Sequence, residues 1–267
     1  MVRSMYVFYS DGFFGYGEPG DFRYFSFFHF LPLLILLVAI IATYHKQDAL
    51  RKWKYEERAR YIYAFIMMIV EMSYFWRLLY IGDETGQNSL LIKLPLQVCQ
   101  WSLISCIFMI LSKNQKLFDI CFYVCLIFGT AACLTPTVIV RTGPTYYRYY
   151  QFFLEHELPI YAIFYMAFVH GMRPRYRGLY MTIFLLIMMA FVCVYVNNRV
   201  PGANFMYLAG FNENAIAGDN IINYLPKGQY TRMILLTFIT ASLFNILYFL
   251  WMKTIGRKYK DDDQLIG

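Results

Sequence analysis

Apolar positions along the chain gather into seven long runs, and the short stretches between the runs carry most of the charge. A helix needs roughly 20 apolar residues, at about 1.5 Å each, to cross the hydrocarbon core of a bilayer. Each run is close to that length, so the pattern predicts seven membrane-spanning helices. They are expected near residues 27–44, 61–81, 90–111, 117–137, 149–170, 177–197 and 231–253.

Basic residues concentrate in every second connection between these runs. Short cytoplasmic loops collect Lys and Arg, whereas exported loops do not. The pattern therefore predicts an N-terminus outside the cytoplasm and a C-terminus inside. It divides the chain into an exported aromatic-rich segment (1–25), a seven-helix domain (26–253) and a charged cytoplasmic tail (254–267). The basic residues are Lys46, Arg51, Lys52, Lys54, Arg58 and Arg60, then Lys113 and Lys116, then Arg173, Arg175 and Arg177, and finally Lys253, Arg257, Lys258 and Lys260.

Composition supports a membrane protein and excludes a soluble one. Hydrophobic residues make up 59% of the chain, and the mean hydropathy of +0.43 exceeds what a soluble core requires. The net charge of +7 lies mostly in the cytoplasmic connections, where it would face anionic headgroups, so no nucleic-acid partner is needed to explain it. We expect an all-α, multi-pass integral membrane protein, in the plasma membrane if the source is bacterial.

All six cysteines fall inside predicted spans, which argues against an extracytoplasmic disulfide framework. Cys121 and Cys125 are one helical turn apart, but no further thiolate or imidazole accompanies them as a metal site would require. Small apolar packing accounts for most of these thiols. The sequence implies neither a metal nor another cofactor.

Polar residues inside the spans collect at one depth, in the outer half of the membrane. Such residues cost free energy in lipid and usually face a cavity or a neighbouring helix. Counted inward from the outer surface, Cys99 in the third span and His156 in the fifth reach a similar depth. The residues expected near them are Gln97, Gln100, Glu155, Glu157, Glu71, Arg77, Asn197, Asn198 and, at the outer end of the first span, His29.

A cysteine beside a histidine is the minimal nucleophile and base for acyl transfer, because the imidazole can take the proton that the thiol loses. Glu155, Glu157 or Glu71 could orient the ring. Other interpretations stay open at this point: Cys99 as a packing residue, His156 as the partner of a neighbouring helix, and Glu71 with Arg77 as either a structural ion pair or a clamp for a lipid headgroup.

Four segments resemble a known family in order along the chain. The run 94–99, Leu-Pro-Leu-Gln-Val-Cys, resembles the Leu-Pro-Leu-His-x-Cys signature of the YwaF-like integral membrane proteins, which also include animal transmembrane protein 164. Residues 28–33 are similar to the opening of that family's first span. Residues 150–156 are similar to its aromatic stretch before a histidine in the fifth span. Residues 197–208, which include Asn204, are similar to its Asn-Tyr-Met-Tyr-Leu loop.

The resemblance implies an acyltransferase that moves a fatty acyl chain between phospholipids, with Cys99 as nucleophile and His156 as base. Its partners would be phospholipid and lysolipid substrates in the membrane. Two positions depart from the family: Gln97 stands where the signature has His, and Leu225-Pro226 stands where many members have Trp-Pro. Gln97 could still donate a hydrogen bond to an oxyanion.

Other classes of function fit part of the pattern. A wet site would make the same Cys and His residues a lipid hydrolase. A transporter or lipid-binding protein is also compatible with seven spans around a polar centre, although no internal repeat accompanies them. A scaffold for other membrane proteins is the third alternative.

Overall fold

The computed structural model describes residues 12–15, 22–81, 94–136, 143–200, 203–208, 226 and 228–255. Within these ranges every regular element is helical and no strand occurs, which confirms the predicted all-α class. Most of the expected N-terminal segment, the connection after residue 81, Leu225 and the tail from residue 256 lie outside the described residues.

The helices follow the predicted apolar runs closely, except in the third run, 90–111. Helix α5 continues through a π-helical turn, η2, into α6, so these three elements form one rod. The bounds are α2 (Phe27–Arg51), α3 (Glu56–Ile81), α4 (Val98–Ser112), α5 (Gln115–Val124), η2 (Cys125–Gly129), α6 (Thr130–Leu134), α7 (Tyr147–His170), α8 (Tyr176–Arg199), the 3-10 turn η4 (Phe205–Tyr207) and α9 (Gln229–Thr254).

Five of these helical segments are long and apolar enough to cross a membrane: α2, the rod Gln115–Leu134, α7, α8 and α9. Helix α3 has 26 residues and carries buried charged side chains, among them Arg60 and Glu71. Helix α4 has 15 residues, which at about 1.5 Å each is shorter than the roughly 30 Å hydrocarbon core.

The third predicted span is the exception, because the helix begins at Val98 and residues 94–97 precede it as non-helical chain. The run 90–111 was expected to form one helix with Cys99 about nine residues from its start. This prediction is wrong, because in the described part of the run the helix begins only one residue before Cys99. Pro95 disfavours helical backbone at Leu94. Gln97 is extended, with ψ of 139°, so Cys99 lies in the first turn of a short helix.

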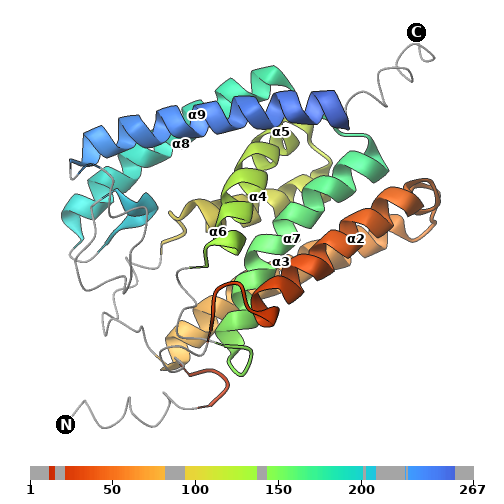
Figure 1. Ribbon diagram of the computed structural model, residues 1–267, viewed down its shortest axis with the longest axis horizontal. Coiled ribbons are helices and arrows are strands. Elements are labelled where there is room, and N and C mark those ends of the chain that lie inside the picture. The colour runs from red at the N-terminus through yellow and green to blue at the C-terminus, as the bar shows by residue number, and fades with distance from the viewer. Residues whose placement is uncertain are drawn as a thin grey trace.

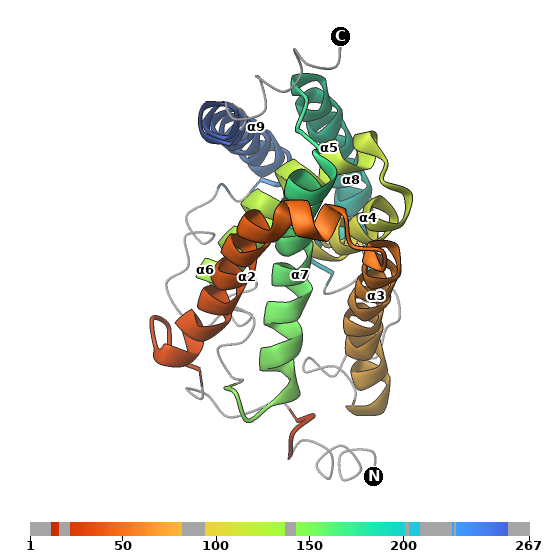
Figure 2. The ribbon, with the colours of Figure 1, turned by 90° about the vertical axis from the view of Figure 1, so that its right-hand side faces the viewer.

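Helix α7 is the centre of the molecule and α9 lies at its edge. The central helix packs against α2, α3, α4 and the α5–α6 rod. In its most apolar stretch 72% of the residues are buried, against 6% for the corresponding stretch of α9. Figure 1 shows α8 and α9 side by side, diverging from the group α2, α3 and α7, and Figure 2 shows the same separation from another side. Helix α4 and the α5–α6 rod lie between the two groups.

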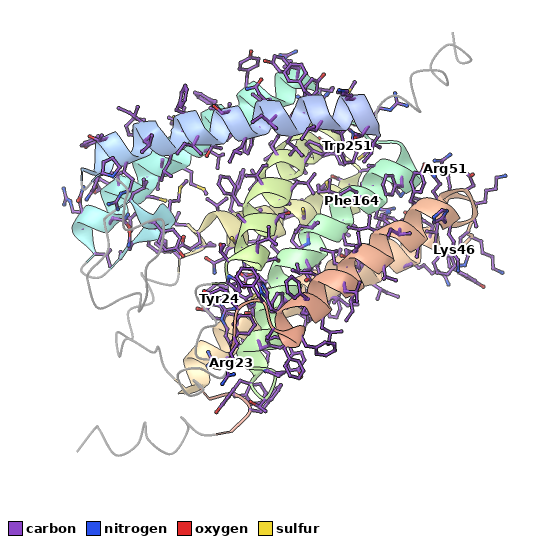
Figure 3. All side chains as sticks on the ribbon, viewed as in Figure 1. Arg23, Tyr24, Lys46, Arg51, Phe164 and Trp251 are labelled. Atoms are coloured by element: carbon purple, nitrogen blue, oxygen red, sulfur yellow. The ribbon has the colours of Figure 1, made fainter. Side chains whose placement is uncertain are left out.

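Basic side chains tie several helix ends together at one end of the bundle. Arg51 donates from Nε to the carbonyl of Val169 at 2.8 Å and from Nη2 to that of Phe168 at 2.9 Å, at the C-terminus of α7. Arg60 donates to the carbonyl of Ile110 near the end of α4. Helix C-termini carry unpaired carbonyls and favour positive charge. Figure 3 places Lys46 and Arg51 at this end, opposite Arg23 and Tyr24.

Candidate functional site

Cys99 lies at the N-terminus of α4, directly after the non-helical residues 94–97. Helix α4 packs against α3 and α7. Cys99 is the one cysteine of the six that is only half-buried. The first N–H groups of a helix have no partner within the helix, and together they form the positive end of its dipole. The thiol of Cys99 is therefore placed where backbone donors and a negative charge can meet.

His156 faces Cys99 from the third turn of α7. The two side chains lie close enough to influence each other electrostatically. On the other side of the ring, Nδ1 lies 2.7 Å from the carbonyl oxygen of Phe152, and the two rings pack at 4.5 Å. Since a carbonyl only accepts, Nδ1 carries a hydrogen, and the neutral ring presents an unprotonated Nε2. A main-chain carbonyl thus orients the ring, rather than Glu155 or Glu157.

A buried ion pair on α7 joins Glu155, the residue before His156, to Arg148, two turns earlier. Arg148 Nη1 is 3.3 Å from Glu155 Oε2, and both side chains are less than a tenth exposed. Gln151 joins them, since its Nε2 donates to Glu155 at 3.0 Å and its oxygen accepts from Arg148. The guanidinium of Arg148 also lies 4.5 Å from the centre of the Tyr74 ring. Glu155 is therefore neutralised by Arg148, a residue that the sequence did not single out.

Glu71 and Glu157 bring further carboxylates to this interior. Neither carboxylate oxygen of Glu71 has a hydrogen-bond partner, and Oε1 of Glu157 has none. Glu71 is 5% exposed and lies close to Gln100, Arg148 and Glu155, whose charges or dipoles act on it. Buried carboxylates usually have partners. The polar side chains of α3, α4 and α7 thus form one cluster beside Cys99.

A short loop segment covers the site from the α8–α9 side. Asn197 at the end of α8 holds Phe205 by both main-chain groups: Nδ2 donates to its carbonyl at 3.1 Å, and Oδ1 accepts from its N–H at 2.8 Å. Gln97 Oε1 accepts from the N–H of Met206 at 3.2 Å, which ties the loop to the residue two before Cys99. Arg232 of α9 donates to the carbonyl of Tyr207 at 2.9 Å.

Tyr207 is the site residue that sequence reasoning missed. Its backbone and that of Met206 are both left-handed, with φ of 56° and 53°, which is uncommon for residues other than glycine. The side chain is largely buried and lies near Cys99 and Arg148, whose charges act on its phenol group. Asn204, the residue chosen from this loop by sequence, precedes η4 as its N-terminal flank.

Three of the predicted site residues hold other parts of the chain. Arg77 donates to the carbonyls of Phe14 at 2.8 Å and Gly15 at 2.7 Å, and so anchors a turn of the N-terminal segment to α3. His29 accepts from the N–H of Phe25 and donates to the carbonyl of Cys133 at 2.9 Å, so both ring nitrogens are engaged. Asn198 accepts from the side chain of Gln229 at the surface.

The buried thiols form a separate group beneath the site. The sulfurs of Cys106 and Cys125 are 3.4 Å apart in the core, between α4 and the π-helical turn. Across the ranges that the structure describes, no three His, Cys, Asp or Glu side chains are arranged to hold a metal ion.

Comparison with known proteins gives one match. The model of the TMEM164 family matches residues 24–253, a range that contains all four segments on which the resemblance rests. A search among curated proteins and one among solved structures gave no significant match. With five apolar helices of spanning length, the match shows an integral membrane protein.

Proposed function

The chain belongs to the TMEM164 family, and from that premise we propose that it is a membrane-embedded acyltransferase that moves a fatty acyl chain between lipids through a thioester on Cys99. One observation carries the proposal. The side chains of Cys99 and His156 lie close enough to interact, and the His156 ring is held by the carbonyl of Phe152 with Nε2 able to accept a proton. Nucleophile, base and an orienting third group are the arrangement that activated nucleophiles require.

In the first half-reaction a donor phospholipid loses its acyl chain. His156 takes the thiol proton, and the sulfur of Cys99 attacks the ester carbonyl carbon, forming an S–C bond. The resulting oxyanion is stabilised by N–H groups at the start of α4. The ester C–O bond then breaks, and His156 returns its proton to the leaving oxygen. The products are a lysolipid and the thioester on Cys99.

In the second half-reaction a lysolipid acceptor takes the chain. Its hydroxyl gives a proton to His156, and the oxygen attacks the thioester carbonyl. The C–S bond breaks, and the sulfur of Cys99 recovers the proton from His156. No net redox change occurs, and the enzyme returns to its starting state.

Burial of the site favours transfer over hydrolysis. His156 is 6% exposed and lies against the Phe152 ring, and the loop at η4 covers the opposite side. A site that excludes water keeps a reactive thioester for the lipid acceptor. With water admitted, the same residues would release a free fatty acid, which is the activity of a lipid hydrolase.

The test uses purified protein in nanodiscs with a labelled phospholipid and a lysolipid acceptor. Intact-protein mass spectrometry is expected to show an acyl adduct in the wild type and in Cys121→Ala, a control that removes a fully buried thiol. Cys99→Ala should lack the adduct and lose turnover by at least about 10³-fold, as when a catalytic nucleophile is removed.

Two results would contradict the proposal. One is an adduct that persists in Cys99→Ala. The other is a wild type with neither adduct nor turnover across a broad panel of lipids, which would favour transport or scaffolding. Label recovered as free fatty acid rather than in the acceptor would identify a hydrolase that uses the same pair.

A further inference from the structure

A narrow apolar crevice lies between α8, α9, the π-helical turn η2 and the loop turn η4. Its walls include Phe128, Ile183, Leu186, Met206, Met233 and Thr237. Apart from two threonines of α9, every side chain that lines it is apolar. Such a surface offers no charged group and few hydrogen-bonding groups to a ligand, so it suits a hydrocarbon chain and excludes a polar headgroup.

Two residues of the inner wall connect the crevice to the segments that carry Cys99 and His156. Met206 lines it, and the N–H of the same residue donates to Gln97, two residues before Cys99. Phe128 lines it as well, and at the next residue, Gly129, a Cβ atom would lie 3.4 Å from the carbonyl oxygen of His156. The inner end of the crevice is therefore one residue away from segments that contact the chain at Gln97 and at His156.

The outer wall of the crevice faces the surroundings of the protein. Phe184 on α8 and Phe238 on α9 are more than 60% exposed, and α9 has little of its surface covered by the rest of the chain. In a membrane-spanning helix, exposed aromatic and aliphatic side chains face lipid hydrocarbon. A chain entering from the bilayer would pass between these two helices without crossing a polar layer.

A second apolar pocket makes a useful comparison. It lies between α2, α7 and the end of α9, and its lining includes Ile40, Tyr44 and Phe164. This pocket is at the basic end of the bundle, where Figure 3 shows Phe164 on the side of Lys46 and Arg51. Position next to the reacting pair, rather than apolar character alone, distinguishes the crevice.

We propose that the crevice between α8 and α9 binds the acyl chain that is transferred, and that it places the ester carbonyl of the chain at Cys99. The proposal rests on the proposed acyltransferase function and assigns the residues of that site that recognise the chain. It predicts that bulk added inside the crevice shortens the chains that the protein accepts.

The first experiment measures binding without catalysis. A phospholipid that carries a photoreactive diazirine at the end of one acyl chain is added to Cys99→Ala protein in nanodiscs, irradiated, and mapped by peptide mass spectrometry. Crosslinks are expected on the inward faces of α8 and α9, at Ile183, Leu186 and Met233. Crosslinks spread evenly over the exposed faces, or concentrated around Phe164, would overturn the assignment.

The second experiment adds bulk with a matched control. Thr237→Phe fills the crevice, whereas Ser242→Phe places the same ring on an exposed part of α9, about 140° away around the helix at roughly 100° per residue. With 18-carbon donors, Thr237→Phe should lower kcat/KM by at least about tenfold relative to 8-carbon donors, because one group in an apolar pocket is worth that much. Ser242→Phe should keep the wild-type ratio.

The two proposals fail separately. Wild-type protein that forms the acyl adduct while Thr237→Phe leaves chain selectivity unchanged would refute the crevice and retain the acyltransferase. Crosslinks confined to the crevice in a protein that forms no adduct and turns over no lipid would refute the acyltransferase and leave a site for a lipid chain. If Thr237→Phe does not fold, Ile183→Phe on the opposite wall serves the same comparison.

Discussion

Tyr207 has an unusual backbone conformation next to the proposed site. Two successive non-glycine residues, Met206 and Tyr207, are left-handed, and each such residue costs on the order of 1–3 kcal/mol. Asn197, Gln97 and Arg232 all bind main-chain groups of this turn and hold it in place. Backbone strain that persists beside a reacting pair is typical of active sites, where it aims a side chain.

Removing the hydroxyl of Tyr207 tests this interpretation. In Tyr207→Phe the ring and its packing remain, while a donor beside Cys99 is lost. We expect kcat to fall by about tenfold or more, as when one donor to a developing oxyanion is removed, with the fold unchanged. Turnover of labelled phospholipid measures the effect. Tyr195→Phe, on an exposed tyrosine of α8, is the control, and an unchanged rate in Tyr207→Phe would leave Tyr207 a structural role only.

The sequence pointed to Cys99 and His156 because their expected depths match and because both lie in segments that resemble the family. It did not identify what orients the histidine, because the acceptor is the carbonyl of Phe152 and a main-chain group leaves no mark in residue identity. It also missed Arg148, the partner of Glu155 two helical turns away. Tyr207 was missed because its position depends on a left-handed backbone at Met206 and Tyr207. Such a backbone is usually predicted from a glycine, and neither residue is one.

At the scale of elements, the start of α4 decides where the nucleophile lies. The apolar run 90–111 predicted one long helix, since hydrophobicity alone does not distinguish helical from extended chain. Pro95 disfavours helical backbone at Leu94, and the helix begins only at Val98. The result is a helix N-terminus inside the protein at Cys99, instead of a helix that passes it.

Asn197 is expected to act as a positioning residue through η4. In Asn197→Ala both hydrogen bonds to Phe205 are lost, so the loop that carries Tyr207 loosens. We expect kcat to fall while KM for the donor lipid changes little, since the crevice walls on α8 and α9 remain. Asn197→Asp keeps the acceptor for the N–H of Phe205 and should restore part of kcat.

Asn245→Ala provides the matched control on α9, where Asn245 accepts from the hydroxyl of Tyr176 away from η4. A uniform loss of stability in Asn197→Ala, without a specific loss of kcat in the folded fraction, would contradict the positioning role.

The crossing of α5 and α8 depends on Gly178. A Cβ atom there would overlap Cβ of Asp119, and Asp119 is held by Arg175 at 2.7 Å and by Gln115 at 2.9 Å. Because Asp119 is held by these two partners, it cannot move away easily. Gly178→Ala should therefore destabilise the protein by about 1–3 kcal/mol, as overpacking a core does. Thermal unfolding in detergent measures this. Gly228→Ala, at the exposed start of α9, should unfold close to the wild-type temperature.

At the scale of the whole molecule, the divergence of α8 and α9 from α2, α3 and α7 places the site where the two groups meet (Figure 1). The sequence predicted an all-α bundle and the alternation of basic connections. It could not predict the divergence, because every span is apolar on faces that contact protein and on faces that contact lipid. In a bilayer the hydrophobic pattern does not tell these faces apart.

Orientation in the membrane is the prediction that belongs to this scale. The basic ends of α2 and α7 lie together, with Arg51 bonded to the carbonyls of Phe168 and Val169, and charge bias places that end in the cytoplasm. Trp53→Cys, in the exposed connection after α2, should therefore react with a membrane-impermeant maleimide only after cells are permeabilised. Gly228→Cys, at the exposed start of α9, is expected on the other side of the membrane and should react in intact cells.

Labelling of the parent protein sets the background, which is expected to be low because five of its six cysteines are buried. The reverse pattern, with Trp53→Cys labelled in intact cells, would show that the protein has the opposite orientation in the membrane. Cys99 and His156 would then keep their geometry and face the cytoplasmic leaflet, so the donor lipid would have to come from that leaflet. Orientation therefore decides which leaflet supplies the substrate, while the chemistry of the pair is decided by residues within the bundle.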